Sequence, residues 1–495
     1  MKFTQINIDP LQVIDHVSPN VFGGFIEHLG RCVYQGVYDP ESALSDEDGF
    51  RVDVMKALKE LQMTIMRYPG GNFASGYHWE DGIGPREERP TVRELAWQSI
   101  ETNAFGTDEF IRLCRKMDWE PMLAVNLGTG TPEEARNWVE YCNSEIGTRY
   151  ANLRSTNGAK KPYGVRYWCL GNEMDGPWQL GHVPAKEYAI RAQQAAKMMK
   201  DCDPDIETIA CGSSGVFMPT FPDWDKEVMQ YIGSLSNYIS LHRYVRNDEN
   251  DPLKFFGTGA KVDRQIEIID ATCRYVQALN KASERNFLCF DEWNIWYKNM
   301  KMDGEGKFAP SLIEEEYNFE DALVTGQFLN SFIRHADVVK IANLAQVVNV
   351  IAPLKTRGDE LLKQTTFHAF KLYSERKEGK ALRLGISGDS FDADVGPVPC
   401  LDTSCIYSKD QGNLALFMIN LSPTEKVSVT ANLFGLEVER VVGQILHHKD
   451  LKAVNTFEKQ DTVVAKDFTD ISSTLDSLQG ELPPDSLVRL DVSIS

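Results

Sequence analysis

The sequence predicts an α/β protein in which a (β/α)8 barrel of the TIM type is followed by an antiparallel, jelly-roll-like β-sandwich. Two observations lead to this prediction. Through the first three quarters of the chain, eight short apolar runs alternate with amphipathic helical patterns, and eight parallel strands can close a barrel. In the last quarter the helical period fades, and short alternating runs are separated by Gly, Pro, Asn and Asp.

The predicted barrel strands have the length and the β-branched or aromatic content of buried strands. Most of them run directly into glycine or polar residues, as a strand does where a βα loop begins. In chain order they cover residues 21–28, 64–71, 122–129, 165–173, 208–214, 238–244, 286–293 and 338–349.

Amphipathic stretches fill the intervals between these strands, and several begin with helix start signals. Thr107 precedes two acidic residues, Thr131 precedes Pro132, and Pro184 stands just ahead of its stretch. The predicted helices cover residues 53–62, 107–117, 131–142, 184–201, 226–232, 261–281, 319–336 and 364–376.

Short alternating runs predict the strands of the sandwich at 405–410, 414–422, 426–435, 439–448, 461–469 and 486–494. Residues 2–9 alternate in the same way, so the N-terminus is expected to add a strand to that sandwich. The predicted organisation is therefore an N-terminal strand segment at 1–15, a barrel at 16–378 and a sandwich at 379–495.

Composition limits the partners. With 52 Lys and Arg against 72 Asp and Glu, the formal net charge is -20, which disfavours nucleic acid and anionic membrane surfaces and favours a neutral ligand. No run approaches the 18 or so apolar residues of a membrane span, and the N-terminus lacks the apolar core of a leader peptide. We therefore expect a cytoplasmic protein.

Polar side chains gather where the predicted strands end, which is the face on which barrel enzymes carry their reactive groups. Each such group must be hydrogen-bonded or hydrated, so a purely structural barrel has little reason to collect them. They are Glu27, Arg67, Asn72, Asn126, Asn172, Glu173, His242, Tyr244, Glu292 and Gln346.

Two glutamates on this rim indicate the chemistry. Glu173 in WCLGNEMDGPW and Glu292 in FLCFDEWNIWY each end an apolar run beside tryptophan. Cleavage of a glycosidic bond requires one carboxylic acid to protonate the leaving oxygen and, in a retaining enzyme, one carboxylate to attack the anomeric carbon from about 5 to 5.5 Å away. We expect Glu173 to be the acid and later the base, with Trp168 and Trp178 as its apolar walls. Glu292 is the expected nucleophile.

Asp291 is an alternative nucleophile because it adjoins Glu292. Neighbouring residues of a strand point to opposite faces, so only one of the two is expected to face the pocket, and Glu292 is preferred.

The roles of the other rim residues leave alternatives open. His242 and Tyr244 share a strand face and could reach the sugar or the nucleophile, and Asn172 could bind the sugar 2-hydroxyl or support its turn. Arg67 could bind substrate or hold a carboxylate as an ion pair.

Three further side chains are candidates for substrate contact. Glu27 is a candidate acceptor for a sugar hydroxyl. Trp178 and Trp296 are candidate walls on the leaving-group side, with ordinary loop packing as the alternative. The sequence contains no zinc, phosphate-loop or dinucleotide motif, so no metal and no organic cofactor are expected.

The phrases GGFIEH, MRYPGGNF, WCLGNEMDGPWQLGH, SLHRY, FDEWNIWY and IANLAQVVNVIAP resemble glycoside hydrolase family 51, the α-L-arabinofuranosidases, and occur in that family's order over most of the barrel. The resemblance implies Glu173 as acid/base and Glu292 as nucleophile, with Arg67 as the support of the nucleophile. It implies a sugar subsite formed by Glu27, Asn72, Asn172, His242, Tyr244 and Gln346. Where the family pattern has a tryptophan, this chain carries Phe308.

The resemblance further implies a retaining exo-acting enzyme that releases arabinofuranose from arabinan, arabinoxylan or their oligosaccharides, and a homo-oligomer, often a hexamer. Two other functions compete with it. One is a related β-glycosidase or endo-glucanase/xylanase of the same barrel clan, because two glutamates on a barrel do not choose a sugar. The other is a carbohydrate-binding protein with an inactive barrel, against which the intact glutamate pair speaks.

Overall fold

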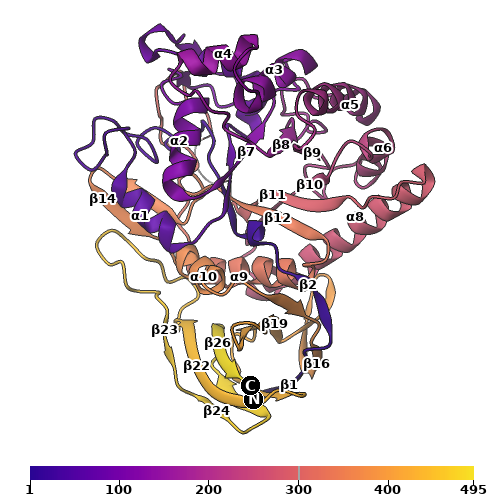
Figure 1. Ribbon diagram of the computed structural model, residues 1–495. Helices are drawn as coiled ribbons and strands as arrows, with labels where there is room; N and C mark the ends of the chain where they lie inside the picture. The colour runs from indigo at the N-terminus through magenta and orange to yellow at the C-terminus, as the bar shows by residue number, and fades with distance from the viewer. Residues whose placement is uncertain (299–301) are drawn as a thin grey trace.

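The computed structural model describes residues 1–298 and 302–495 and contains a closed barrel of eight parallel strands, drawn above a β-sandwich in Figure 1. The predicted fold class is confirmed. Each barrel strand overlaps one of the predicted runs, and the ring closes where β12 pairs with β3. The strands are β3 (Gly23–Phe25), β4 (Ile65–Tyr68), β7 (Glu120–Ala124), β8 (Tyr167–Leu170), β9 (Glu207–Ala210), β10 (Tyr238–Val245), β11 (Phe287–Ile295) and β12 (Val339–Ala345).

Helices cover the outside of the barrel. Thr131 caps α3 as predicted, its hydroxyl accepting a hydrogen bond from the backbone N–H of Glu134. The sequence prediction missed α4 and α7. The helices are α1 (Val52–Glu60), α2 (Thr107–Met117), α3 (Pro132–Asn143), α4 (Arg149–Thr156), α5 (Ala185–Cys202), α6 (Asp223–Ile232), α7 (Pro252–Phe256), α8 (Thr258–Asn280), α9 (Phe319–Arg334) and α10 (Thr365–Ser374).

The sandwich consists of two sheets that enclose a second apolar core. One sheet has the strand order β2 (Val13–His16), β15 (Lys380–Leu382), β19 (Leu401–Ser408), β20 (Asn413–Asn420), β26 (Ser486–Ile494), β22 (Val438–His447) and β23 (Lys466–Phe468). The other has the order β16 (Gly385–Gly388), β1 (Lys2–Ile8), β21 (Val427–Leu433), β25 (Ser477–Leu482) and β24 (Ile471–Ser473).

The N-terminal strand β1 lies within the second sheet. It pairs with β21 in parallel, from Lys2 opposite Val427 to Ile8 opposite Leu433, so one pair of this otherwise antiparallel sheet is parallel. For the chain as a whole we propose the division 1–15, 16–378 and 379–495, with the first segment belonging to the sandwich.

Helices α9 and α10 lie between the barrel and the sandwich (Figure 1). The ring of Tyr373 on α10 stacks on Phe417 of β20 at 4.3 Å, and Ser404 of β19 donates a hydrogen bond to Asn330 of α9 at 2.6 Å. Among the described residues, no helix combines the length and apolarity needed to cross a bilayer.

Candidate active site

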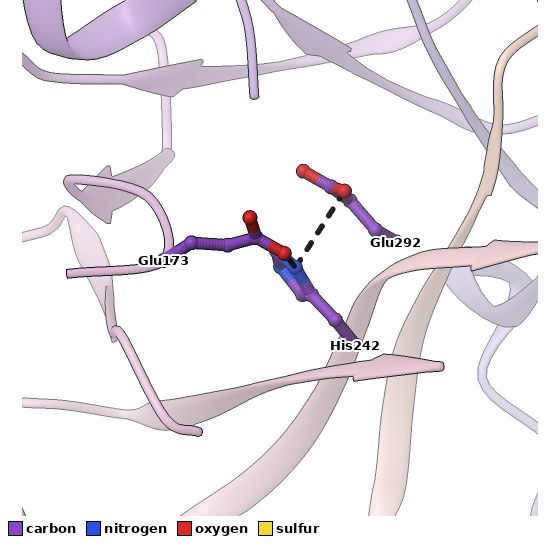
Figure 2. A group of neighbouring side chains, drawn as sticks. All are labelled: Glu173, His242 and Glu292. Carbon is purple, nitrogen blue, oxygen red and sulfur yellow. Dashed lines mark hydrogen bonds and ion pairs between the residues drawn. The ribbon is translucent and has the colours of Figure 1, made fainter. Parts of the chain in front are cut away.

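The two predicted catalytic glutamates lie at the ends of barrel strands and face each other. Glu173 follows β8 after Gly171, and its own φ of +44° is uncommon outside glycine. Glu292 belongs to β11. One carboxylate oxygen of each and a ring nitrogen of His242 all lie within 4.8 Å of one another, and Figure 2 shows the three side chains converging.

Both carboxylate oxygens of Glu292 are held by hydrogen bonds. Arg67 Nη1 donates to Oε1 at 2.8 Å, and the Tyr244 hydroxyl donates to Oε2 at 2.8 Å. Burial raises the pKa of Glu292, and the positive charges of His242 and Arg67 oppose that rise. The arrangement leaves Glu292 oriented toward Glu173 and stabilised as a carboxylate by charged and neutral donors.

His242 connects three carboxylates. Its Nδ1 lies 2.9 Å from Glu173 Oε1 and 3.5 Å from Glu292 Oε2, while its Nε2 lies 3.2 Å from Asp291 Oδ1. Burial alone would lower the pKa of His242, but Glu292 and Asp291 raise it well above its usual value. When both ring nitrogens carry a proton, the ring can donate to Glu173 and to Asp291 at the same time.

Asp291 corrects an expectation about strand geometry. Cys289 pairs with Ser240 and Glu292 pairs with His242, so β11 has two residues where β10 has one, which is a β-bulge. Because the bulge breaks the alternation, Asp291 and Glu292 both contact Arg67 and His242 instead of pointing to opposite faces. Only Glu292 also lines the cavity described next.

A cavity of about 630 Å³ opens over the glutamate pair. Most of the predicted substrate-binding residues line it, whereas Arg67 and Asn172 lie buried outside its lining. The predicted catalytic residues Glu173 and Glu292 line it together with the predicted substrate-binding residues Glu27, Asn72, Trp178, His242, Tyr244, Trp296 and Gln346.

Glu27 closes one side of this cavity. Its carboxylate accepts hydrogen bonds from the backbone N–H of Phe73 at 3.0 Å, Trp97 Nε1 at 3.1 Å and Gln346 Nε2 at 3.0 Å. Burial, followed by the charge of Glu292, raises its pKa to about 8.

A glycine is required beside Glu27. A Cβ at Gly71 would lie 2.6 Å from its Oε2, so any other residue here would displace the carboxylate.

Asn172 and Arg67 form a buried layer below the cavity. Arg67 Nη2 donates to Asn172 Oδ1 at 2.8 Å, and Asn172 Nδ2 lies 3.5 Å from Asn72 Oδ1. Arg67 is fully buried and contacts both Glu292 and Asp291, so it is an ion-pair partner here, which was one of its two predicted roles.

Asn126 stabilises the loop in which it lies. Its side chain donates to Tyr77 O at 3.0 Å and accepts from the backbone N–H groups of Gly128 and Thr129 at 3.0 Å, which shapes the loop after β7.

Of the three tryptophans predicted as walls of the site, Trp178 and Trp296 line the cavity and Trp168 does not. Trp178 Nε1 donates to Glu173 Oε2 at 2.5 Å, and Trp296 packs edge-on against Tyr244 at 5.3 Å. Trp168 is not a wall of the site, so that prediction was wrong. Its neighbours on β8, Tyr167 and Cys169, face the barrel interior, and alternation therefore turns Trp168 outward.

Sequence reasoning missed part of the lining. Trp97 lies in the long loop after β4, which has no periodic pattern, and the segment 214–217 follows β9. Ile313 and Ile351 come from later loops and are joined by a backbone hydrogen bond of 2.9 Å. The sequence signal available for this part of the lining was SSGVF at the end of a predicted strand, because barrel active sites are built from the loops that follow the strands.

The group Glu173, His242 and Glu292 also has the composition of a metal site. A metal would require a deprotonated His242 nitrogen. In this structure Nδ1 instead lies 2.9 Å from Glu173 Oε1, and both oxygens of Glu292 accept hydrogen bonds from Arg67 and Tyr244. The donor set therefore fits a proton-transfer site better than a metal centre.

Comparisons with known proteins identify the family of the chain. A family model described as the alpha-L-arabinofuranosidase 1 domain matches residues 57–259, and one described as the alpha-L-arabinofuranosidase C-terminal domain matches residues 291–486. An intracellular exo-alpha-(1->5)-L-arabinofuranosidase of Bacillus subtilis is 43% identical over 469 residues, 94% of each chain. The chain belongs to glycoside hydrolase family 51.

Other family 51 proteins share the whole architecture. The solved structure of a family 51 alpha-L-arabinofuranosidase from Bifidobacterium longum superposes with a TM-score of 0.95 at 35% identity, covering 99% of this chain and 100% of that one. An exo-alpha-(1->6)-L-arabinofuranosidase of Bifidobacterium longum is 40% identical over 96% of this chain and 94% of its own length. The chain described here is therefore a glycoside hydrolase, an α-L-arabinofuranosidase.

Proposed function

We propose that the enzyme is a retaining, exo-acting α-L-arabinofuranosidase that works by double displacement. In the first step a carboxylate oxygen of Glu292 attacks the anomeric carbon while Glu173 protonates the departing glycosidic oxygen. The products are a covalent arabinofuranosyl ester on Glu292 and the free alcohol. In the second step Glu173 takes a proton from water, the water oxygen attacks the anomeric carbon, and Glu292 leaves as the carboxylate.

The spacing of the two carboxylates carries the proposal. Oxygen atoms of Glu173 and Glu292 within 4.8 Å match the separation of about 5 to 5.5 Å used by retaining enzymes. An inverting enzyme needs about 6.5 to 9.5 Å to place a water between them.

The exo preference is supported by two loops that meet over one side of the cavity. Backbone hydrogen bonds join Gly304 to Trp97 at 2.8 Å, Gly306 to Gln98 at 2.7 Å, and Ile100 to Lys307 at 3.0 Å. They connect the loop after β4 to the loop after β11 beside Trp97, which contacts Glu27. A site closed in this way accepts a chain end more readily than the middle of a polymer.

The sugar subsite in this proposal is formed by Glu27, Asn72, His242, Tyr244 and Gln346. Arg67 and Asn172 support it from below, and Trp178 and Trp296 form the leaving-group side. Glu27 and Gln346 hold each other by two hydrogen bonds, so the polar groups are oriented before substrate arrives.

The proposed substrates are terminal arabinofuranosyl residues of arabinan, arabinoxylan or derived oligosaccharides. Similar proteins are named for (1->5) and for (1->6) linkages, so linkage preference is part of the test. We also propose that the enzyme acts inside the cell, as the Bacillus subtilis relative is named, and forms a homo-oligomer, a hexamer by resemblance to its family.

Product analysis tests this function against a β-glycosidase or an endo-glucanase. We expect an aryl α-L-arabinofuranoside to be cleaved with kcat/KM at least about 10³-fold above aryl β-D-glucoside or β-D-xyloside, because oriented polar groups reject a sugar that leaves them unpaired. Arabinan should release arabinose as its first product. Initial release of oligosaccharides, or a preference for a β-glycoside, would contradict the proposal.

A further inference from the structure

Asp291 has no part in the double displacement, yet it is one of the most enclosed charges in the barrel. It is 1% exposed, and its Oδ2 lies 3.3 Å from Arg67 Nη2. Its Oδ1 lies 3.2 Å from His242 Nε2 and accepts a hydrogen bond from the Ser240 hydroxyl. Cys169 Sγ is 3.9 Å from Oδ2. Each cation that contacts Asp291 also contacts a proposed catalytic glutamate.

We propose that Asp291 is a positioning residue whose carboxylate holds His242 and Arg67 in the orientation in which they serve Glu173 and Glu292. This inference rests on the proposed function. Asp291 does not line the cavity, so it acts through these two side chains and not on the sugar.

The geometry of the imidazole ring explains how Asp291 orients His242. The two ring nitrogens lie on opposite edges, so anchoring Nε2 on Asp291 directs Nδ1 at Glu173 Oε1, 2.9 Å away, and at Glu292 Oε2, 3.5 Å away. An ionised Asp291 also requires a proton on Nε2, which excludes the other neutral tautomer.

The charges around Asp291 support its role as a partner of both Arg67 and His242. Burial would raise the pKa of Asp291, but Arg67 and His242 lower it, and the same contacts raise the pKa of His242. The charged or titratable groups around His242 come from three other elements. Glu173 follows β8, Asp291 and Glu292 lie on β11, and Arg67 lies on β4. Arg67 is linked to His242 through the carboxylates of Asp291 and Glu292, which both side chains contact. Tyr244 on its own strand contacts Glu292. With Asp291 neutral, two buried cations would share one fewer carboxylate, and His242 would lose its proton more readily.

The test is Asp291→Asn, which keeps the shape and removes the charge, with Ser240→Ala as the matched control that removes only a hydrogen bond to the same carboxylate. On an aryl α-L-arabinofuranoside, Asp291→Asn should lower kcat about 100-fold with KM within about threefold, because the reacting groups lose their alignment. Ser240→Ala should stay within about threefold of the wild type in both constants.

The pH profile and NMR provide readouts that a merely structural role would not move. Neutral His242 forms as pH rises, so a lower His242 pKa in Asp291→Asn should move the alkaline limb of kcat/KM to lower pH. In ¹⁵N-histidine spectra of the wild type, His242, assigned from the signal lost in His242→Gln, should keep both ring protons from pH 5 to 8. In Asp291→Asn it should titrate within that range.

Three results would overturn the inference. The first is wild-type kcat and pH profile in Asp291→Asn, and the second is a neutral His242 ring in the wild-type spectrum, a measurement that stands even if the variant does not fold. The third is a trapped glycosyl adduct on Asp291, which would make it the nucleophile. Failure of the proposed function would look different, because the wild type itself would then not cleave the α-L-arabinofuranoside.

Discussion

Glu292→Gln is expected to lower kcat/KM for aryl and natural α-L-arabinofuranosides at least about 10⁴-fold, as the loss of a covalent nucleophile does in other enzymes. Glutamine keeps the shape of the side chain: its amide oxygen can still accept from Arg67, and its NH2 group can donate to the Tyr244 hydroxyl oxygen, so the cavity should persist. Steady-state kinetics with an activated aryl substrate measures the effect, because a good leaving group cannot compensate for a missing nucleophile.

The control for this variant is arabinose binding. Isothermal titration should give an affinity within about tenfold of the wild type, since only one hydrogen-bonding oxygen has been exchanged. Residual activity above about one per cent that survives further purification would remove Glu292 from the role of nucleophile.

Glu173→Ala should have a divided effect. Substrates with poor leaving groups, such as arabino-oligosaccharides, should lose about 10²- to 10⁴-fold in kcat, because their glycosidic oxygen must be protonated as it leaves. Activated aryl substrates should still form the glycosyl-enzyme, and turnover should then stall because no base activates water. A burst of phenol release, followed by a slow steady state, measures this.

Azide provides the decisive control for that variant. It needs no base and fits the space left by the missing carboxylate, so it should restore turnover and give the α-arabinofuranosyl azide. Azide should leave the wild type and Glu292→Gln unaffected. A β-configured azide product, or equal losses for good and poor leaving groups, would show that Glu173 is not the acid/base.

The barrel could be predicted from the sequence because its signals are repeated and local. Eight apolar runs alternate with amphipathic stretches, and Thr131 before Pro132 marks a helix start that the structure contains. The same logic identified the strand ends that carry Glu173 and Glu292. Strands β24 and β25 escaped prediction because ISS has only three residues, two of them exposed, and SLQGEL contains a glycine and three polar residues.

The details of the site could not be predicted from the alternation of inward and outward residues along the strands alone. The bulge in β11 brings Asp291 onto the same side as Glu292, although strict alternation separates them. Alternation did hold in β8, but the phase that turns Trp168 outward is set by the packing of its neighbours inside the barrel. Trp97 reaches Glu27 from a loop 70 residues away along the chain, and no local pattern marks such a contact.

The configuration of the first product tests the central claim most directly. Free arabinofuranose mutarotates, so the reaction of wild-type enzyme with an aryl α-L-arabinofuranoside should be run in dilute methanol and followed by ¹H NMR. Two carboxylates within 4.8 Å of each other predict methyl α-L-arabinofuranoside, with the configuration of the substrate kept through two displacements. Methyl β-L-arabinofuranoside, the product of a single displacement, would contradict the account.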